Sequence, residues 1–160
     1  MVRPTPSLEE LPMVDMSQAL ADFERARAES RVRVTTKIDR LKHAVLAPLR
    51  ELGITSVEIA FDGYGDSGAV ERIFSYDAEN QESELPEEAV VLLEGDDTAR
   101  ETSLRSALEE LTYAALELHH PGWENNDGAG GALEIDVAQG SFMLDCKLRY
   151  TAYDDHYDEL

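Results

Sequence analysis

The sequence predicts an α+β domain in which an antiparallel sheet of four or five strands carries its helices on one face. Two observations lead to this fold class. A long apolar stripe with helical spacing ends at His119, and patterns of alternating apolar and polar residues follow Gly53 and Gly131. Elements that are apolar on one side bury those sides together, so the helix and the last hairpin should share one core: Leu108, Leu111, Ala115, Ile135, Val137, Phe142 and Leu144.

The length and composition suit one domain. The chain has 160 residues, of which 42% are hydrophobic, and this is enough to bury a sizeable core. Residues 1–14 contain three prolines and no periodic pattern, which predicts a flexible N-terminal arm. We expect a single α+β domain over residues 15–155, followed by an acidic C-terminal tail over residues 156–160.

A helical pattern occupies much of the N-terminal third. Asp15 resembles the start of a capping box, and apolar positions at helical spacing follow it. The β-branched run at residues 32–36 should interrupt or weaken this helix. A second apolar stripe leads to Gly53, which is well placed to end a helix; it consists of Ile38, Leu41, Val45, Leu49 and Leu52, with Pro48 as the expected kink. The pattern leaves open whether residues 15–52 form one kinked helix or two.

Alternating patterns then predict strands. Residues 54–62 place Val57, Ile59 and Phe61 on one face, which is typical of a half-buried strand. The further predictions for this part of the chain are a turn at 63–68, a partner strand at 69–77, a surface loop at 78–88 and a strand at 89–95.

The most regular helical pattern comes next. Thr98 and Glu101 have the spacing of a capping box, which predicts a helix from Ala99 to His119. Its apolar stripe consists of Leu104, Leu108, Leu111, Ala115 and Leu118.

The last hairpin is predicted from the alternation on both sides of Gln139-Gly140. If these form a two-residue turn, the facing pairs are Val137 with Phe142, Ile135 with Leu144, and Leu133 with Cys146. The same register places Glu134 opposite Asp145. Two facing carboxylates repel each other, so this pair needs solvent, a base such as Lys147, a cation or a basic partner.

The charge balance restricts the classes of partner. The chain carries 34 acids and 14 bases, a net charge of −20, which argues against direct binding of nucleic acid or of an anionic membrane. Residues 54–160 hold five bases and 26 acids, so nearly all the negative charge lies there. The single cysteine excludes an intramolecular disulfide, and without a signal-peptide or transmembrane pattern we expect a cytoplasmic location.

One segment departs from this acidic balance. Between Arg25 and Lys42, seven basic residues stand against two acids, a net charge of +5. Such a helical arm is either a solvated face that partly neutralises the acidic body or a surface through which the chain forms a homo-oligomer.

The loop from His119 to Gly131 has a composition suited to presenting side chains. It contains the only tryptophan, and its candidate binding residues are Trp123, Glu124, Asn125, Asn126 and Asp127. The hairpin adds Glu134 and Asp145 to this set. Trp123 either anchors the loop to the core or serves as a platform for a ligand, and the Asn and Asp side chains otherwise satisfy turn backbones.

Four carboxylates in the two Gly-rich loops are candidates for a metal site: Asp62, Asp66, Glu124 and Asp127. Oxygen ligands of this kind suit Mg²⁺ or Ca²⁺. Their spacing matches no established loop, however, and the sequence does not require a cofactor. Ser67 in GDSG has no His–Asp pair that the spacing identifies, so no catalytic residue is assigned.

Two motifs carry a resemblance to a known family. They are GYGDSG at residues 63–68 and HPGWENNDG at residues 120–128. With the residues around them, over roughly 38–155, the chain resembles an uncharacterised bacterial family of domains of unknown function, found in proteobacteria and their mobile elements. The resemblance implies no activity. It does imply that the two Gly-rich acidic loops belong to one structural unit.

These observations favour a non-enzymatic, acidic protein-binding module that acts on a basic partner. A DNA mimic that inhibits a nucleic-acid-binding protein is its most concrete version. One alternative is a divalent-metal-dependent hydrolase built on the two Gly-rich acidic loops. The other is a self-assembling structural accessory protein that uses the basic helical arm.

Overall fold

The computed structural model describes residues 15–94 and 98–160. The flexible arm predicted for residues 1–14 lies outside the described residues. The chain divides into two compact units, the first ending at Arg33 and the second spanning Val34–Leu160.

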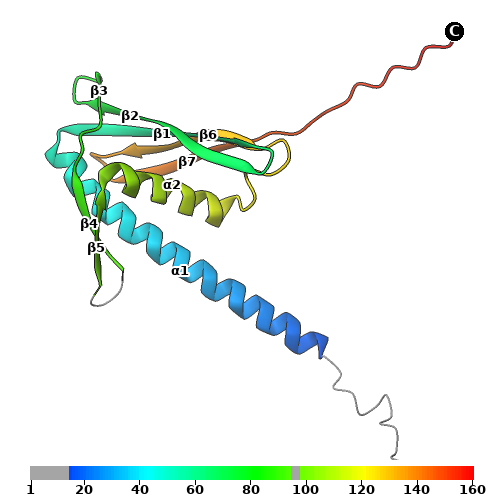
Figure 1. Ribbon diagram of the computed structural model, residues 1–160, viewed down its shortest axis with the longest axis horizontal. Coiled ribbons are helices and arrows are strands. Elements are labelled where there is room, and N and C mark those ends of the chain that lie inside the picture. The colour runs from blue at the N-terminus through cyan, green and yellow to red at the C-terminus, as the bar shows by residue number, and fades with distance from the viewer. Residues whose placement is uncertain (1–14, 95–97) are drawn as a thin grey trace, which may run out of the picture. The chain divides into compact units, whose positions relative to one another are not determined.

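A five-stranded antiparallel sheet is the main element of the second unit (Figure 1). Its strand order is β3-β2-β1-β6-β7, and the strands are β1 (Ile54–Tyr64), β2 (Ser67–Asp77), β3 (Glu82–Ser83), β6 (Ala129–Asp136) and β7 (Ser141–Leu148). A separate two-stranded sheet joins β4 (Ala89–Leu93) to β5 (Ala99–Ser103). The predicted α+β class is therefore confirmed, as is the strand expected in the apolar run after residue 88.

Helix α1 (Met16–Glu51) is continuous, so the interruption expected at residues 32–36 is wrong. Each β-branched residue costs a helix at most about 0.7 kcal/mol, and strong helix formers stand on both sides of the run. Pro48 also lies inside the helix. The end of the helix agrees with the sequence, because Gly53 adopts a positive φ of 74° directly after the last turn.

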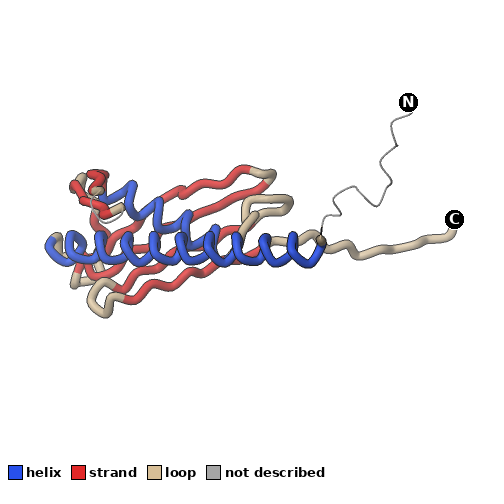
Figure 2. The backbone as a smooth tube through the Cα atoms, turned by 90° about the horizontal axis from the view of Figure 1, so that it is seen from below, coloured by secondary structure: helices blue, strands red, loops and turns tan. Residues whose placement is uncertain are grey.

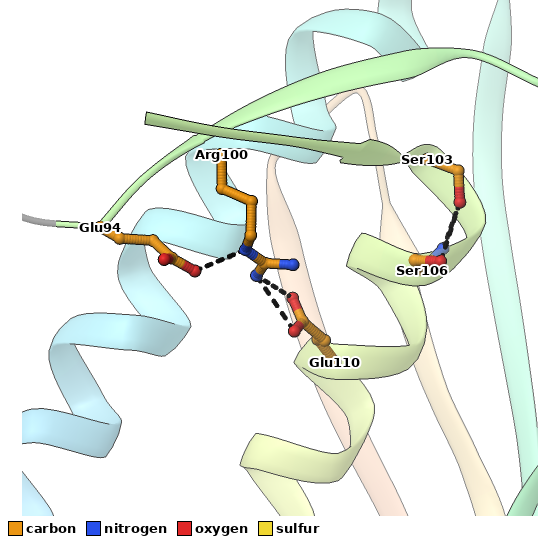
Figure 3. Close-up of polar contacts among 5 residues, drawn as sticks. All are labelled: Glu94, Arg100, Ser103, Ser106 and Glu110. Atoms are coloured by element: carbon orange, nitrogen blue, oxygen red, sulfur yellow. Dashed lines mark hydrogen bonds and ion pairs between the residues drawn. The ribbon is translucent and has the colours of Figure 1, made fainter. Parts of the chain in front are cut away.

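Helix α2 (Leu104–His119) begins five residues later than the capping box predicted, so that prediction is wrong. Residues Ala99–Ser103 form β5 instead, and the N-cap is Ser103, whose Oγ accepts the Ser106 backbone N–H at 3.0 Å (Figure 3). The strand is held by pairing with β4 and by Arg100, which donates to Glu94 Oε1 at 2.6 Å and Glu110 Oε2 at 2.9 Å.

Within the second unit, α2 and residues 34–51 of α1 cover one face of the large sheet (Figures 1 and 2). Ile38, Leu41, Val45 and Leu49 of α1 and Leu104, Leu108 and Leu111 of α2 form a buried core with Val57, Ile59, Leu133 and Ile135 of the sheet. The predicted core is confirmed for six of its seven residues: Leu108, Leu111, Ile135 and Val137 belong to this core, and Phe142 and Leu144 pack partly buried against it. Ala115 is buried but lies outside this cluster. Within the described residues, no helix has the length and apolar character needed to cross a membrane.

The register of the last hairpin differs from the prediction by two residues. Asp136 faces Ser141, so residues 137–140 form a four-residue loop in which Asp136 Oδ1 accepts the Gln139 N–H at 3.1 Å. A shift by two keeps every side chain on its predicted face, because strand side chains alternate with period two. It changes the facing pairs, however, and Glu134 lies opposite Met143 while Asp145 lies opposite Ala132.

The buried helix stripe makes the first prediction. Leu111→Ala should lower the free energy of unfolding by about 2–5 kcal/mol, because Leu111 is 1% exposed and its removal leaves a cavity. Urea denaturation of this variant and of the exposed-site control Glu117→Ala measures the difference. A loss at Leu111 no larger than that at Glu117 would contradict the packing of α2 on the sheet.

The start of α2 makes the second prediction. Ser103→Ala should lower the free energy of unfolding by about 1 kcal/mol, because it removes the acceptor of the Ser106 N–H. Thr98→Ala is the matched control, since the sequence pattern favours Thr98 as the cap and the structure places it ahead of the β5 strand. If the two variants lost equal free energies of unfolding in the same denaturation experiment, the assignment of Ser103 as the N-cap of α2 would be wrong.

Candidate functional site

The two Gly-rich loops lie together at one end of the sheet. The turn between β1 and β2 donates two backbone hydrogen bonds to the loop after α2: Gly65 N–H to Asn126 O at 3.1 Å, and Asp66 N–H to Glu124 O at 3.0 Å. Asp66 and Asn126 both adopt positive φ, at 66° and 57°, a conformation that Asp and Asn tolerate in turns. The two loops, residues 63–68 and 120–128, therefore form one structural unit, which we name the loop unit.

Trp123 anchors this unit to the core. It is only 7% exposed and packs edge-to-face on Phe61, with ring centroids 5.5 Å apart. The opposing hairpin supplies glycines where the ring lies: a Cβ atom added to Gly63 would stand 2.7 Å from the indole, and one added to Gly68 would be closer still. Of the two predicted roles for Trp123, the structure supports the anchor, since little of the ring is left for a ligand.

The positively charged side chain of Arg149 binds to the loop unit. The Arg149 guanidinium forms an ion pair with Asp62 and donates to Gly63 O at 3.3 Å. Two residues further on, Thr151 Oγ1 donates to Asp127 Oδ2 at 2.6 Å. The Arg149 backbone N–H also donates to Gly128 O at 2.9 Å. The segment that follows β7 is therefore tied to both Gly-rich loops.

The four candidate metal ligands do not form a metal-binding group. Asp62 and Asp127 bind Arg149 and Thr151 as described, and Asp66 lies in the exposed tip of the β1–β2 turn. In residues 15–94 and 98–160 there is no group of three or more His, Cys, Asp or Glu side chains able to hold a metal ion. The carboxylates of Asp62 and Asp127 instead make contacts that shape the loops.

The face of the sheet opposite the helices carries a second acidic arrangement. Glu58 of β1 lies directly opposite Glu134 of β6, and Asp136 is the next outward residue along β6. Facing residues in an antiparallel pair have Cα atoms only about 4.5–5.5 Å apart, so the two glutamates are close neighbours. The predicted pairing of Glu134 with Asp145 is therefore wrong, and Glu134 faces Glu58 instead.

These carboxylates border a shallow hollow of about 480 Å³. Its polar lining includes Ser56, Glu58, Tyr76, Glu134 and Asp136. No ion pair joins Glu58, Glu134 or Asp136 to a base of the described residues. We name the group formed by Glu58, Glu134, Asp136 and Tyr76 the acidic hollow.

Asp145 lies on the same face but is already paired. Lys147 Nζ donates to Asp145 Oδ2 at 2.7 Å, and this hydrogen bond, with the charges of Asp145 and Glu134, raises the pKa of Lys147. Between them, Cys146 is partly buried, and burial together with the Asp145 charge raises the pKa of its thiol. The thiol is therefore protonated at neutral pH and is a poor nucleophile.

A comparison with models of protein families shows which family the chain belongs to. A model of a family of unknown function, DUF6878, matches residues 37–160. The chain belongs to the DUF6878 family. No curated protein and no solved structure matches it.

The DUF6878 match covers the loop unit and the acidic hollow in full, and it begins close to the boundary between the two compact units. Both candidate sites therefore belong to the family domain. Met16–Arg33 of α1 lies outside the match.

Sequence reasoning missed three residues of the DUF6878 domain that the structure makes central. The alternation of Val57, Ile59 and Phe61 leaves Glu58 on the outward face of its strand, but the partner of Glu58 depends on the β1–β6 pairing, which local periodicity does not reveal. Sequence reasoning misses Tyr76 for the same reason, because its place in the acidic hollow also depends on strand pairing. Arg149 did carry a signal, because residues 54–160 contain only five bases among 26 acids, and each isolated base in such a field should bind carboxylates.

The contact between Trp123 and the hairpin glycines makes the third prediction. Gly68→Ala should lower the free energy of unfolding by about 1–3 kcal/mol, because the new methyl group overlaps the indole. In a Trp123→Ala background the same substitution should cost much less. A double-mutant cycle, measured by urea denaturation, tests this coupling. Additive losses would show that the two loops do not pack as one unit.

Proposed function

We propose that the DUF6878 domain of this chain is a non-enzymatic binding module whose acidic hollow receives a basic side chain of a partner protein. The observation that supports it is the pairing of Glu58 with Glu134, next to Asp136, on a sheet face that the helices leave open. Like charges placed this close destabilise each other. A lysine or arginine from a partner would relieve that repulsion on binding.

The shape of the hollow suits such a side chain. Carboxylates accept hydrogen bonds from an ammonium or a guanidinium, and a guanidinium can bind two carboxylate oxygens at once. Tyr76, which lies at the rim and is half-buried, offers its ring to the aliphatic part of the same side chain. The binding contact is therefore expected to combine charge with apolar contact.

The rest of the domain supports long-range attraction. Residues 54–160 carry a net charge of −21. The described ion pairs in this range bind bases to Asp62, Glu94, Glu110 and Asp145, which leaves most of its acids to act on the surroundings. A field of this kind raises the rate at which a basic partner arrives and loses strength as salt rises.

The concrete version of this function is inhibition of a nucleic-acid-binding protein by a DNA mimic. The surface of such a partner is basic because it neutralises phosphates, so an acidic sheet face can occupy it in place of nucleic acid. The motif resemblance supports a bacterial, mobile-element-associated setting for the proposal. A cytoplasmic site of action agrees with the single, unpaired cysteine.

The fourth prediction tests the acidic hollow with an arginine- and lysine-rich peptide as the probe. Glu58→Gln combined with Glu134→Gln should weaken binding of the peptide to the full chain at least about tenfold, the equivalent of about 1.4 kcal/mol. The matched control is Glu79→Gln with Glu84→Gln, which removes the same charge from two exposed positions on either side of β3. Isothermal titration calorimetry measures both affinities, and binding should weaken as salt rises.

Equal losses for the two double variants would contradict the proposal, because net charge alone would then explain binding. Competition tests the DNA-mimic version. The full chain should displace duplex DNA from a basic DNA-binding domain, and the Glu58→Gln/Glu134→Gln variant should do so less well than the control variant. A chain that binds the peptide but displaces no DNA would retain the binding module and exclude the mimic.

A further inference from the structure

The first unit of the chain presents a helix without buried residues. Every residue from Met16 to Arg33 is exposed, and the large apolar side chains Met16, Leu20 and Phe23 are exposed by 77%, 59% and 64%. Most of the stability of a helix in a protein comes from packing an apolar face. Three large apolar residues in water on such a helix indicate an interaction surface.

These three residues share one side of the helix. Their spacings of four and three place Met16, Leu20 and Phe23 in one stripe. The stripe continues along the same side with two small residues, Ala26 and Ser30, and with Arg27, which follows Phe23 by four positions and Leu20 by seven. Large apolar residues therefore occupy the first half of the stripe, and small residues with one arginine occupy the second half.

The charges of the segment divide in the same place. Residues 15–24 contain three acids, Asp15, Asp22 and Glu24, and no base. Residues 25–33 contain four arginines and one glutamate. The helix is therefore acidic over its first half and basic over its second.

We propose that residues 16–33 of α1 pair antiparallel with the same residues of a second copy of this chain. In that orientation the acidic half of each helix faces the basic half of the other, and Leu20 and Phe23 face the small residues Ala26 and Ser30. A parallel pair would place acid against acid and large against large. The surface is thus complementary to itself about a twofold axis, as a homodimer requires.

This pairing does not depend on the acidic hollow. The helix segment lies in the first compact unit and outside the DUF6878 match, which begins at residue 37. Failure of peptide binding and failure of dimer formation are therefore separate results.

The fifth prediction concerns dimer formation, which sedimentation equilibrium of the full chain measures. The wild-type chain should sediment as a monomer–dimer equilibrium. Leu20→Gln with Phe23→Gln should raise the dimer dissociation constant about 100-fold or more, because two large apolar contacts are lost in each copy. The control Ala21→Gln with Ala28→Gln adds the same side chains on the opposite side of the helix and should leave the constant within about threefold of wild type. Glutamine is a good helix former, so both variants keep the helix.

Charge exchange tests the orientation. Asp22→Lys with Glu24→Lys should weaken the dimer, and so should Arg27→Glu with Arg33→Glu. The four substitutions together restore the acid-to-base pattern with its direction reversed, so an antiparallel dimer should recover to near wild-type affinity. A chain that stays monomeric to about 1 mM overturns the proposal. A dimer whose dissociation constant is unchanged by Leu20→Gln with Phe23→Gln also overturns it. If the variant with all four charge substitutions does not regain dimer affinity, the antiparallel arrangement is wrong.

Discussion

The one-sided burial of β1 is the constraint on which the fold of the second unit depends. This strand lies between β2 and β6, and Val57, Ile59 and Phe61 alternate inward under the helices. Because side chains on a strand alternate, the same eleven residues must send Glu58 and Asp62 to the open face. The alternation along β1 therefore places core residues on one face of the sheet and residues of the acidic hollow on the other. A shift of β1 by one residue would exchange these two sets of side chains.

A second contact fixes the end of the sheet. Trp123 fills the space left by Gly63 and Gly68, so the loop that follows α2 is held against the β1–β2 hairpin. Gly128 lies so close to Gly63 that a Cβ atom there would overlap the Gly63 carbonyl. The glycines that make the two motifs distinctive are thus explained by close packing of backbone and ring. They are not evidence for a ligand that the loops bind.

Local patterns predicted the elements well and their partners poorly. The periodicity of Leu104, Leu108 and Leu111 and the alternation of Val57 and Ile59 predicted the core faces correctly, since burial acts on each element separately. The start of α2 was misplaced because Thr98-x-x-Glu101 is a sound cap in isolation, and only pairing with β4 converts it to strand. Tertiary pairing overrides a capping preference that amounts to about 1 kcal/mol.

The candidate site shows the same division. Glu134 was identified from its outward position on a strand, but its neighbour depends on a loop length that Gln139-Gly140 does not determine. A two-residue turn and a four-residue loop give registers that differ by two and bury the same apolar residues. Glu58 enters the site only through the pairing of two strands that are far apart in sequence, since residues 58 and 134 are 76 positions apart. No periodicity within one segment carries that information.

The distribution of charge explains why self-association and acidic binding would use different parts of the chain. The second unit, residues 34–160, has nine bases and 28 acids, so two copies brought together through it would repel each other. Residues 15–33 have four bases and four acids and are neutral as a segment. Two such helices can approach without that penalty, and their opposed acidic and basic halves favour contact. Rising salt should weaken the capture of a basic partner strongly, whereas a dimer built on Leu20 and Phe23 should keep its apolar contribution.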